Sequence, residues 1–312
     1  MEIKIGKLKL KNPVMVASGT FGYAKEFEEL VDLKKLGAIV TKTITLKPRD
    51  GNPMPRVCET ASGMLNAIGL QNEGVENFID EKLPYLAKIG VPIIVSISGD
   101  FVKLAKRLDK EEAVDGIELN ISCPNVKGQG TPCENQRFRT GQARDPIRES
   151  KISYGAGKGQ GLVAQCPEST YDVVKSVRKV TDKTLITKLS PNVTDIVEIA
   201  KAACKGGTDA VSLVNTFLAM AIDIETEKPK LGNITGGLSG PAIKPIALRM
   251  VWEVAKNINK PVIGMGGIMT SEDAIEFLLA GAKAVQIGTA NFVDPSVCEK
   301  IIKGIEAWTK KK

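Results

Sequence analysis

Residues 261–289 read PVIGMGGIMTSEDAIEFLLAGAKAVQIGT. A short apolar run at 261–264 leads through a glycine turn into an amphipathic stretch at 271–280, and a second apolar run follows at 284–287. Thr270-Ser-Glu-Asp273 is a good helix start, because a threonine side chain can cap the first turn of a helix. This order of strand, helix and strand predicts a parallel βαβ unit.

The same alternation runs through the whole chain. Candidate strands lie at 13–17, 38–42, 92–98, 116–121, 185–189, 210–214, 261–264 and 284–287. Helical patterns lie between them, at 24–36, 75–89, 101–112, 169–180, 194–205, 242–257, 271–280 and 295–307. Eight alternations predict an α/β fold with parallel strands, and eight is the number that closes a (β/α)₈ TIM barrel. An open doubly wound sheet is the alternative, although no Gly-x-Gly-x-x-Gly follows the first strand.

Three further segments do not belong to a minimal barrel. Ile3–Leu10 alternates polar and apolar residues and predicts a short hairpin across the barrel floor. Pro48–Glu59 and Ala221–Leu231 follow the second and sixth strands and are candidates for small extra β excursions over the barrel mouth. Because the chain shows no internal repeat and no low-complexity linker, residues 1–312 are predicted to form a single domain.

A polar, glycine-bearing and charged stretch, residues 131–160, follows the fourth strand. We expect an extended loop insertion there, at the active-site end of the barrel. Structureless loops of this length are usually either functional or disordered. A lid, a partner-docking segment and a merely decorative loop therefore all stay open.

The composition excludes several classes of protein. The net charge of +7 is spread along the chain and aromatic residues make up 4%, so no nucleic-acid surface is expected. No apolar run approaches the roughly 20 residues of a membrane helix. The start lacks the apolar segment of a signal peptide, so we expect a cytoplasmic protein. The six cysteines form no Cys-x-x-Cys pair and histidine is absent, which argues against a metal site and excludes a Ser–His hydrolase.

Glycine turns end the last two candidate strands. Catalytic and binding groups of barrels come from the carboxyl ends of the strands. There the chain has Gly264-Met-Gly-Gly-Ile268 and Gly288-Thr289. Backbone N–H groups in such turns commonly hold a phosphate, so we predict a phosphate-bearing ligand, with ordinary tight turns as the alternative. Residues 235–241, TGGLSGP, are expected to form a third flexible turn before a helix.

Lysine and asparagine occupy other strand ends. Lys42 and Lys188 each end an apolar strand. Lysine is rarely buried unless it is paired, so two of them at the mouth suggest an anion or an electron-rich ring, unless they are surface charge. Further polar residues would converge on the same mouth: Asn66, Asn120, Asn125, Asn215 and Thr216. As a set, these amides suit a planar ligand with amide and carbonyl groups, although each alone would be a turn residue or cap.

Cys123 differs from the other cysteines in its position. It follows the end of the fourth strand and precedes Pro124 in a polar loop. Most free cysteines are small buried hydrophobes, which fits Cys204 and Cys298 in their helical patterns. Because the chain has no histidine, a thiol at the active-site end is a candidate general base.

Five segments together resemble the class 1 dihydroorotate dehydrogenases. They are NAIGLQN (66–72), NISCPNV (120–126), KLSPNVTD (188–195), NITGGLSGPAIKP (233–245) and IGTANF (287–292). The fourth is particularly similar to class 1B, the NAD-linked type. The resemblance covers essentially the whole chain apart from the loop near 131–160.

The resemblance implies an FMN-containing oxidoreductase that converts (S)-dihydroorotate to orotate in de novo pyrimidine (UMP) biosynthesis. The family's catalytic base falls on Cys123, which would remove the C5 proton while a hydride leaves C6 for the flavin. FMN contacts would fall on Ser18, Lys42, Thr43, Ser96, Asn120, Lys188, Val214, Gly240, Gly266, Gly267, Gly288 and Thr289. Substrate contacts would fall on Lys42, Asn66, Ala67, Ile68, Gly69, Leu70, Asn120, Asn125, Asn215 and Thr216. Lys188 would balance negative charge at the N1/O2 edge of the reduced flavin.

Class 1B enzymes pair such a subunit with a second one that carries FAD and a [2Fe–2S] cluster and passes electrons to NAD⁺. The resemblance therefore implies this partner, around a homodimer core of a heterotetramer. The chain itself lacks the clustered cysteines that a [2Fe–2S] cluster needs. It departs from the family at Ser96, where relatives often have an asparagine near the flavin, and in the longer stretch after Cys123.

Two other functions compete with this interpretation. A dihydropyrimidine dehydrogenase shares the barrel and the cysteine base, but resembles Ser-Cys-Pro-His where this chain has Asn125. A flavin-free aldolase barrel would use Lys42 or Lys188 to form a Schiff base. A non-catalytic binding barrel fits least, given a thiol and two lysines at one mouth.

Overall fold

The computed structural model describes residues 2–121 and 163–311, and within them eight parallel strands close into a barrel. The strands are β3 (Val14–Val16), β4 (Ala38–Val40), β7 (Ile93–Ile97), β8 (Gly116–Asn120), β9 (Thr184–Lys188), β10 (Ala210–Leu213), β15 (Val262–Met265) and β16 (Ala284–Ile287). Pairing of β16 with β3, Val285 opposite Val14, joins the last strand to the first. The predicted (β/α)₈ barrel is therefore confirmed, and the open sheet is wrong.

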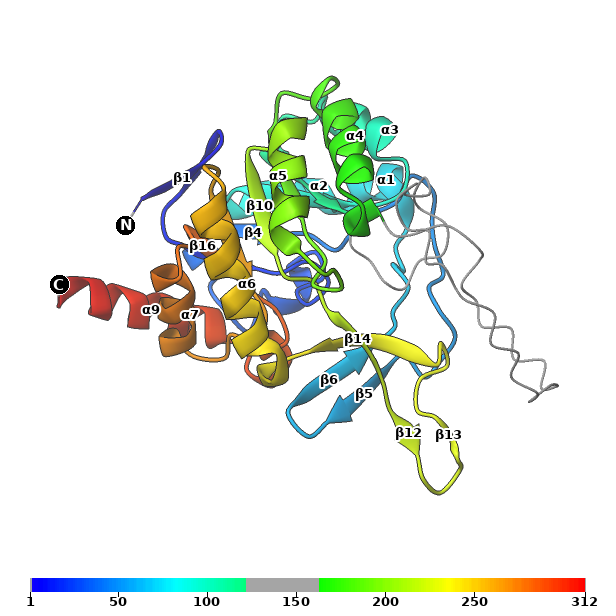
Figure 1. The fold of residues 1–312 in the computed structure, drawn as a ribbon. Coiled ribbons are helices and arrows are strands. Elements are labelled where there is room, and N and C mark those ends of the chain that lie inside the picture. Colours follow the sequence, from blue (N-terminus) through cyan, green and yellow to red (C-terminus); the bar gives the residue numbers. More distant parts are fainter. Residues whose placement is uncertain (1, 122–162, 312) are drawn as a thin grey trace.

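Helices cover the outside of the barrel (Figure 1). They are α2 (Leu83–Ile89), α3 (Phe101–Leu108), α4 (Pro167–Arg178), α5 (Ile196–Gly206), α6 (Lys244–Asn257), α7 (Ser271–Leu279) and α9 (Val297–Lys310). Helix α7 begins as predicted, because the Thr270 hydroxyl accepts from the Asp273 N–H while the Asp273 carboxylate accepts from the Thr270 N–H. In the described ranges, no helix combines the length and apolar character of a membrane span.

The helix predicted at 24–36 is wrong, whereas the helix predicted at 75–89 is confirmed and contains a π-helical turn. The 24–36 segment forms only the 3₁₀ turns Lys25–Phe27 and Leu33–Lys35, because Ala24 has a φ of 70° and Asp32 is extended. The 75–89 segment is divided into α1 (Gly74–Asn77), a π-helical turn (Phe78–Lys82) and α2. Pro84 lies in the first turn of α2 and has no N–H, so it cannot continue the hydrogen bonding of the preceding turns.

A hairpin closes the amino-terminal end of the barrel, as predicted. Strands β1 (Ile3–Ile5) and β2 (Leu8–Leu10) pair antiparallel. Ile5, Leu8 and Leu10 are buried against the lowest inward side chains of the barrel strands. This floor is an apolar layer.

A four-stranded antiparallel sheet lies at the opposite end (Figure 1). It contains β5 (Val57–Thr60), β6 (Gly63–Asn66), β11 (Phe217–Met220) and β14 (Thr235–Ser239), and the ribbon β12 (Ile222–Asp223) and β13 (Lys228–Pro229) projects from it. The predicted extra β-strands over the barrel mouth are confirmed, but their residue ranges differ from the predicted 48–59 and 221–231. The predicted turn at 235–241 is wrong: its first five residues are strand β14, which pairs with both β6 and β11.

Candidate active site

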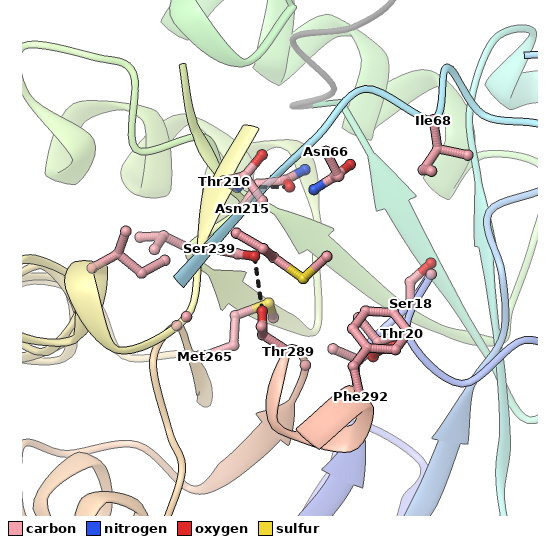
Figure 2. A pocket seen from close by; sticks show the side chains of 18 of the residues that line it. Ser18, Thr20, Asn66, Ile68, Asn215, Thr216, Ser239, Met265, Thr289 and Phe292 are labelled. Atoms are coloured by element: carbon pink, nitrogen blue, oxygen red, sulfur yellow. Dashed lines mark hydrogen bonds between the residues drawn. The ribbon is translucent and has the colours of Figure 1, made fainter. Parts of the chain in front are cut away.

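One pocket opens at the carboxyl ends of the barrel strands, beneath the four-stranded sheet. Figure 2 shows Asn66, Asn215 and Thr216 together on one side of the pocket, and Ser18, Thr20 and Phe292 on another. The barrel supplies most of the wall through residues at or just after the ends of β3, β4, β8, β9, β10, β15 and β16. Strands β5, β6 and β14 add Val57, Met64 and Ser239. The pocket is thus where the fold class places its active sites.

Most of the sequence-predicted site residues meet in this pocket. Those lining it are Ser18, Lys42, Thr43, Asn66, Ile68, Gly69, Leu70, Asn120, Lys188, Val214, Asn215, Thr216, Gly240, Gly266, Gly267, Gly288 and Thr289. Two predicted residues do not line it. Ser96 lies one layer deeper inside the barrel, and Ala67 points into the small apolar core of the covering sheet. Cys123 and Asn125 lie outside the described residues, as does the predicted loop insertion at 131–160.

Thr43 is the centre of a buried hydrogen-bond network at one side of the pocket. Its Oγ1 lies 3.1 Å from Ser18 Oγ and 2.9 Å from Ser96 Oγ, and it accepts from Asn120 Nδ2 at 3.1 Å. A hydroxyl has one proton, so Thr43 can donate to only one of the two serines. Ser96 therefore supports Thr43 from below, and its predicted contact with the flavin stays a prediction.

The amide side chains form a second network on the other side. Asn215 Nδ2 donates to Asn120 Oδ1 at 3.3 Å, and Asn215 Oδ1 accepts from the Thr216 N–H at 2.8 Å. Asn66 Nδ2 reaches the Gly237 carbonyl of β14 at 3.4 Å. Asn120 joins the two networks, so its orientation is fixed from both sides.

The glycine turns present unused backbone donors. The N–H groups of Gly266, Gly267, Gly288 and Thr289 donate no backbone hydrogen bond within the described ranges. Gly267 has a φ of +74°, and a Cβ there would lie 2.8 Å from Lys244 N and 2.9 Å from the Gly240 carbonyl. A Cβ at Gly288 would meet nothing closer than 3.7 Å, so packing does not require glycine at that position. Its missing side chain leaves room in the pocket.

Lys188 reaches the pocket from β9 and has a buried carboxylate beneath it. Its side chain is 7% exposed, and its Nζ lies 3.7 Å from Glu118 Oε1. Glu118 Oε2 accepts from Ser212 Oγ at 3.0 Å and from Gln286 Nε2 at 2.9 Å. The sequence reasoning missed Glu118, although a lone acid within the apolar run of β8 was a usable signal.

Other lining residues were also missed. Ser239 of β14 accepts a hydrogen bond from the Thr289 hydroxyl at 2.8 Å and so connects the covering sheet to the last glycine turn (Figure 2). Met64, Met265 and Phe292 add apolar walls, and Phe292 is 56% exposed at the rim. No local sequence signal marks Met64 and Ser239, because they reach the pocket only through the antiparallel pairing of the covering sheet. Met265 and Phe292 lie in segments that the sequence analysis singled out, at 264–268 and 287–292, but it gave them no role.

The free cysteines of the described ranges do not compete for a role in proton transfer. Burial raises the pKa of the Cys298 thiol to about 12, with further contributions from Asp294 and Glu299. Burial also raises the pKa of Cys204. Cys58 lies on β5, and none of the three lines the pocket. In the same ranges no three acidic or cysteine side chains gather as metal ligands would.

Comparison of the sequence with known proteins identifies the family of this chain. The sequence profile of the dihydroorotate dehydrogenases matches residues 1–144 and 147–308. The chain belongs to the dihydroorotate dehydrogenase family. It is 51% identical to a protein of Geotalea uraniireducens over 99% of this chain and 92% of the relative. It is 52% identical to one of Trichlorobacter lovleyi (99% and 93%) and 51% identical to one of Phocaeicola vulgatus (100% and 94%). Each of the three is named dihydroorotate dehydrogenase B (NAD(+)), catalytic subunit.

Dihydroorotate dehydrogenases are flavin-dependent, and the pocket has features that fit a flavin nucleotide. The unpaired N–H groups of the two glycine turns suit a phosphate. The Thr43 and Asn120 networks offer fixed donors and acceptors to a planar ring, and Lys188 supplies a positive charge at the pocket's base. The buried donors and the room at Gly288 therefore agree with the family's cofactor class.

Proposed function

We propose that this chain oxidises (S)-dihydroorotate to orotate with FMN as its cofactor. One observation carries the proposal: a single pocket unites unpaired backbone donors, a buried ammonium group and a fixed set of amide side chains. The first suits a phosphate, the second an electron-accepting ring, and the third the carbonyl and amide edge of a pyrimidine. Relatives of similar sequence carry the name of this activity.

The FMN would be held by the residues that surround the two glycine turns and by the hydroxyl network. Gly266, Gly267, Gly288 and Thr289 would donate their N–H groups to the phosphate. Thr43, held by Ser18, Ser96 and Asn120, would fix one edge of the ring system. When bound, FMN supplies the acceptor for the hydride that leaves C6 of the substrate.

Proton removal at C5 is assigned to Cys123. It lies between Asn120 and Asn125 in the sequence, and the chain offers no histidine for the task. A thiol must be ionised to act as a base, so the rate should rise with pH as the thiolate forms. Asn66, Asn120, Asn125 and Asn215 would orient the pyrimidine, so that the C5 proton faces the thiolate.

Lys188 would hold positive charge where negative charge appears as electrons arrive. Its ion pair with Glu118 suits a fixed charge, whereas a Schiff-base lysine must act as a neutral amine. This disfavours the aldolase alternative. Asn125, in place of the histidine of dihydropyrimidine dehydrogenases, favours an orotate-type substrate.

The electrons would then pass to a second subunit that carries FAD and a [2Fe–2S] cluster, and from there to NAD⁺. The words "catalytic subunit" in the relatives' names support a partner. We propose a homodimer of this chain as the core of the heterotetramer, acting in the cytoplasm in pyrimidine synthesis.

Anaerobic mixing of the FMN-loaded protein with dihydroorotate tests the proposal. We expect the flavin absorbance near its visible maximum to bleach, and dihydrouracil to leave it unchanged. The Cys123→Ala variant should retain FMN and lose nearly all reduction at neutral pH, whereas the matched control Cys298→Ala should reduce at the wild-type rate. Bleaching by dihydrouracil alone, or full activity of Cys123→Ala, would contradict the assignment.

A further inference from the structure

The proposed chemistry leaves a buried carboxylate without a role. Glu118 lies on β8 with its side chain inside the barrel and has no exposed surface. Ser212 of β10 and Gln286 of β16 both donate to its Oε2, from two other strands of the barrel. The carboxylate is therefore held in place from across the interior, one layer below Asn120.

The other oxygen of this carboxylate has no hydrogen-bond partner among the described residues. Glu118 Oε1 lies 3.7 Å from Lys188 Nζ, which is too far for a hydrogen bond but close enough for strong attraction in a buried setting. The N–H groups of the Lys188 ammonium thus remain available to a ligand in the pocket. The Glu118 carboxylate beneath it positions the ammonium and offsets its charge.

We propose that Glu118 is a positioning residue that acts through Lys188. It holds the ammonium at the base of the pocket and weakens the pull of that charge on electrons entering a bound flavin. A buried cation with no counter-charge would favour the reduced flavin more strongly, because nearby charge tunes a cofactor's electronics. The inference rests on the proposed function, since it needs a flavin above Lys188.

The reduction potential of the bound FMN measures this effect directly, apart from turnover. Glu118→Gln keeps the shape of the side chain and one oxygen that can accept from Ser212 and Gln286, but it removes the charge and replaces the other oxygen with an NH₂ donor. We expect the equilibrium between oxidised and reduced FMN to move at least about tenfold toward the reduced form, which is about 30 mV for a two-electron couple. Glu118→Asp keeps the charge one methylene further away and should give a smaller shift of the same sign.

The role through Lys188 is tested by a double-variant cycle. In a Lys188→Met background there is no ammonium for Glu118 to position or offset, so Glu118→Gln should then shift the potential much less than it does in the wild-type background. Equal shifts in both backgrounds would overturn the proposal. So would an unchanged potential in Glu118→Gln and Glu118→Asp together with a lower melting temperature, since that marks a purely structural residue.

Two measurements on the wild-type protein distinguish a failure of the proposed function from a failure of the inference about Glu118. If the wild-type protein binds no FMN, the proposed function fails before any variant is compared. If it binds FMN and is reduced by dihydroorotate while the Glu118 variants match its potential, only the inference about Glu118 fails. If Glu118→Gln does not fold, the Glu118→Asp potential decides, and no shift there overturns the inference.

Discussion

The two ends of the barrel are built from the same strands but have opposite chemistry. At the floor, the inward positions are apolar: Met15, Ala38, Val40, Ile94, Ile186, Ala210, Ile263 and Ala284. One layer further along the barrel strands, the inward positions include polar or charged residues: Ser96, Glu118, Lys188, Ser212 and Gln286. Strand register produces the change, since residues two apart on a strand share a face, as with Ile94 and Ser96.

This difference separates stability from chemistry. The floor is covered by the β1–β2 hairpin, and the described residues that form this layer are all apolar. The mouth buries polar groups that satisfy one another only in part, as the orphan oxygens of Glu118 and Gln286 show. Incomplete satisfaction is costly in a core and useful in a site, because unpaired donors and charges remain for a ligand.

A substitution at the mouth is expected to slow flavin reduction strongly while it changes the stability of the fold only a little. Lys42→Met removes a pocket cation whose side chain is only half-buried. We expect flavin reduction by dihydroorotate to slow by about 10²- to 10³-fold, as when one electrostatic contact to the reacting groups is lost. The free energy of unfolding in urea should change by less than about 1 kcal/mol. A Lys42→Met variant whose flavin is reduced at the wild-type rate would show that Lys42 is only a surface charge.

At the floor, the reverse is expected. Leu10→Ala leaves a cavity beneath the hairpin, where the wild-type side chain has no exposed surface. We expect the free energy of unfolding to fall by about 3 kcal/mol. Flavin reduction, measured well below the melting temperature, should stay at the wild-type rate. A slower flavin reduction in a fully folded Leu10→Ala protein would break the separation between the two ends.

A buried thiol beside the barrel offers a contrast with Cys123, the cysteine to which we assign proton removal. The pKa of Cys298 is raised to about 12, so the folded protein keeps this proton above pH 9 while the unfolded chain loses it. Stability is therefore lost as pH rises. Over this range the thiol ionises only in the unfolded chain. Between pH 8 and pH 10 the free energy of unfolding should therefore fall by about 1.4 kcal/mol more in the wild-type protein than in Cys298→Ala. Urea unfolding of both proteins at the two pH values measures it, and parallel losses would contradict the raised pKa.

The sequence predicted the barrel well because its signals are local. Apolar runs, amphipathic stretches and the Thr270 cap each span few residues, and all eight barrel strands were placed to within two residues. The 24–36 segment failed as a helix because Ala24 adopts positive φ, which its amphipathic pattern does not reveal. The 235–241 segment failed as a turn because its glycines fit a strand packed against Thr216, where a Cβ at Gly237 would clash with the threonine hydroxyl.

By itself, the sequence determined the strand ends, and with them Lys42, Lys188 and the two glycine turns, since period and spacing fix which face and which end a residue occupies. Only the tertiary structure decided which of these groups meet. The 3.7 Å pair of Glu118 and Lys188, the Thr43 network and the contact of Ser239 with Thr289 join residues far apart in the chain. Closure of the barrel and pairing in the covering sheet set those distances, and no local pattern contains them.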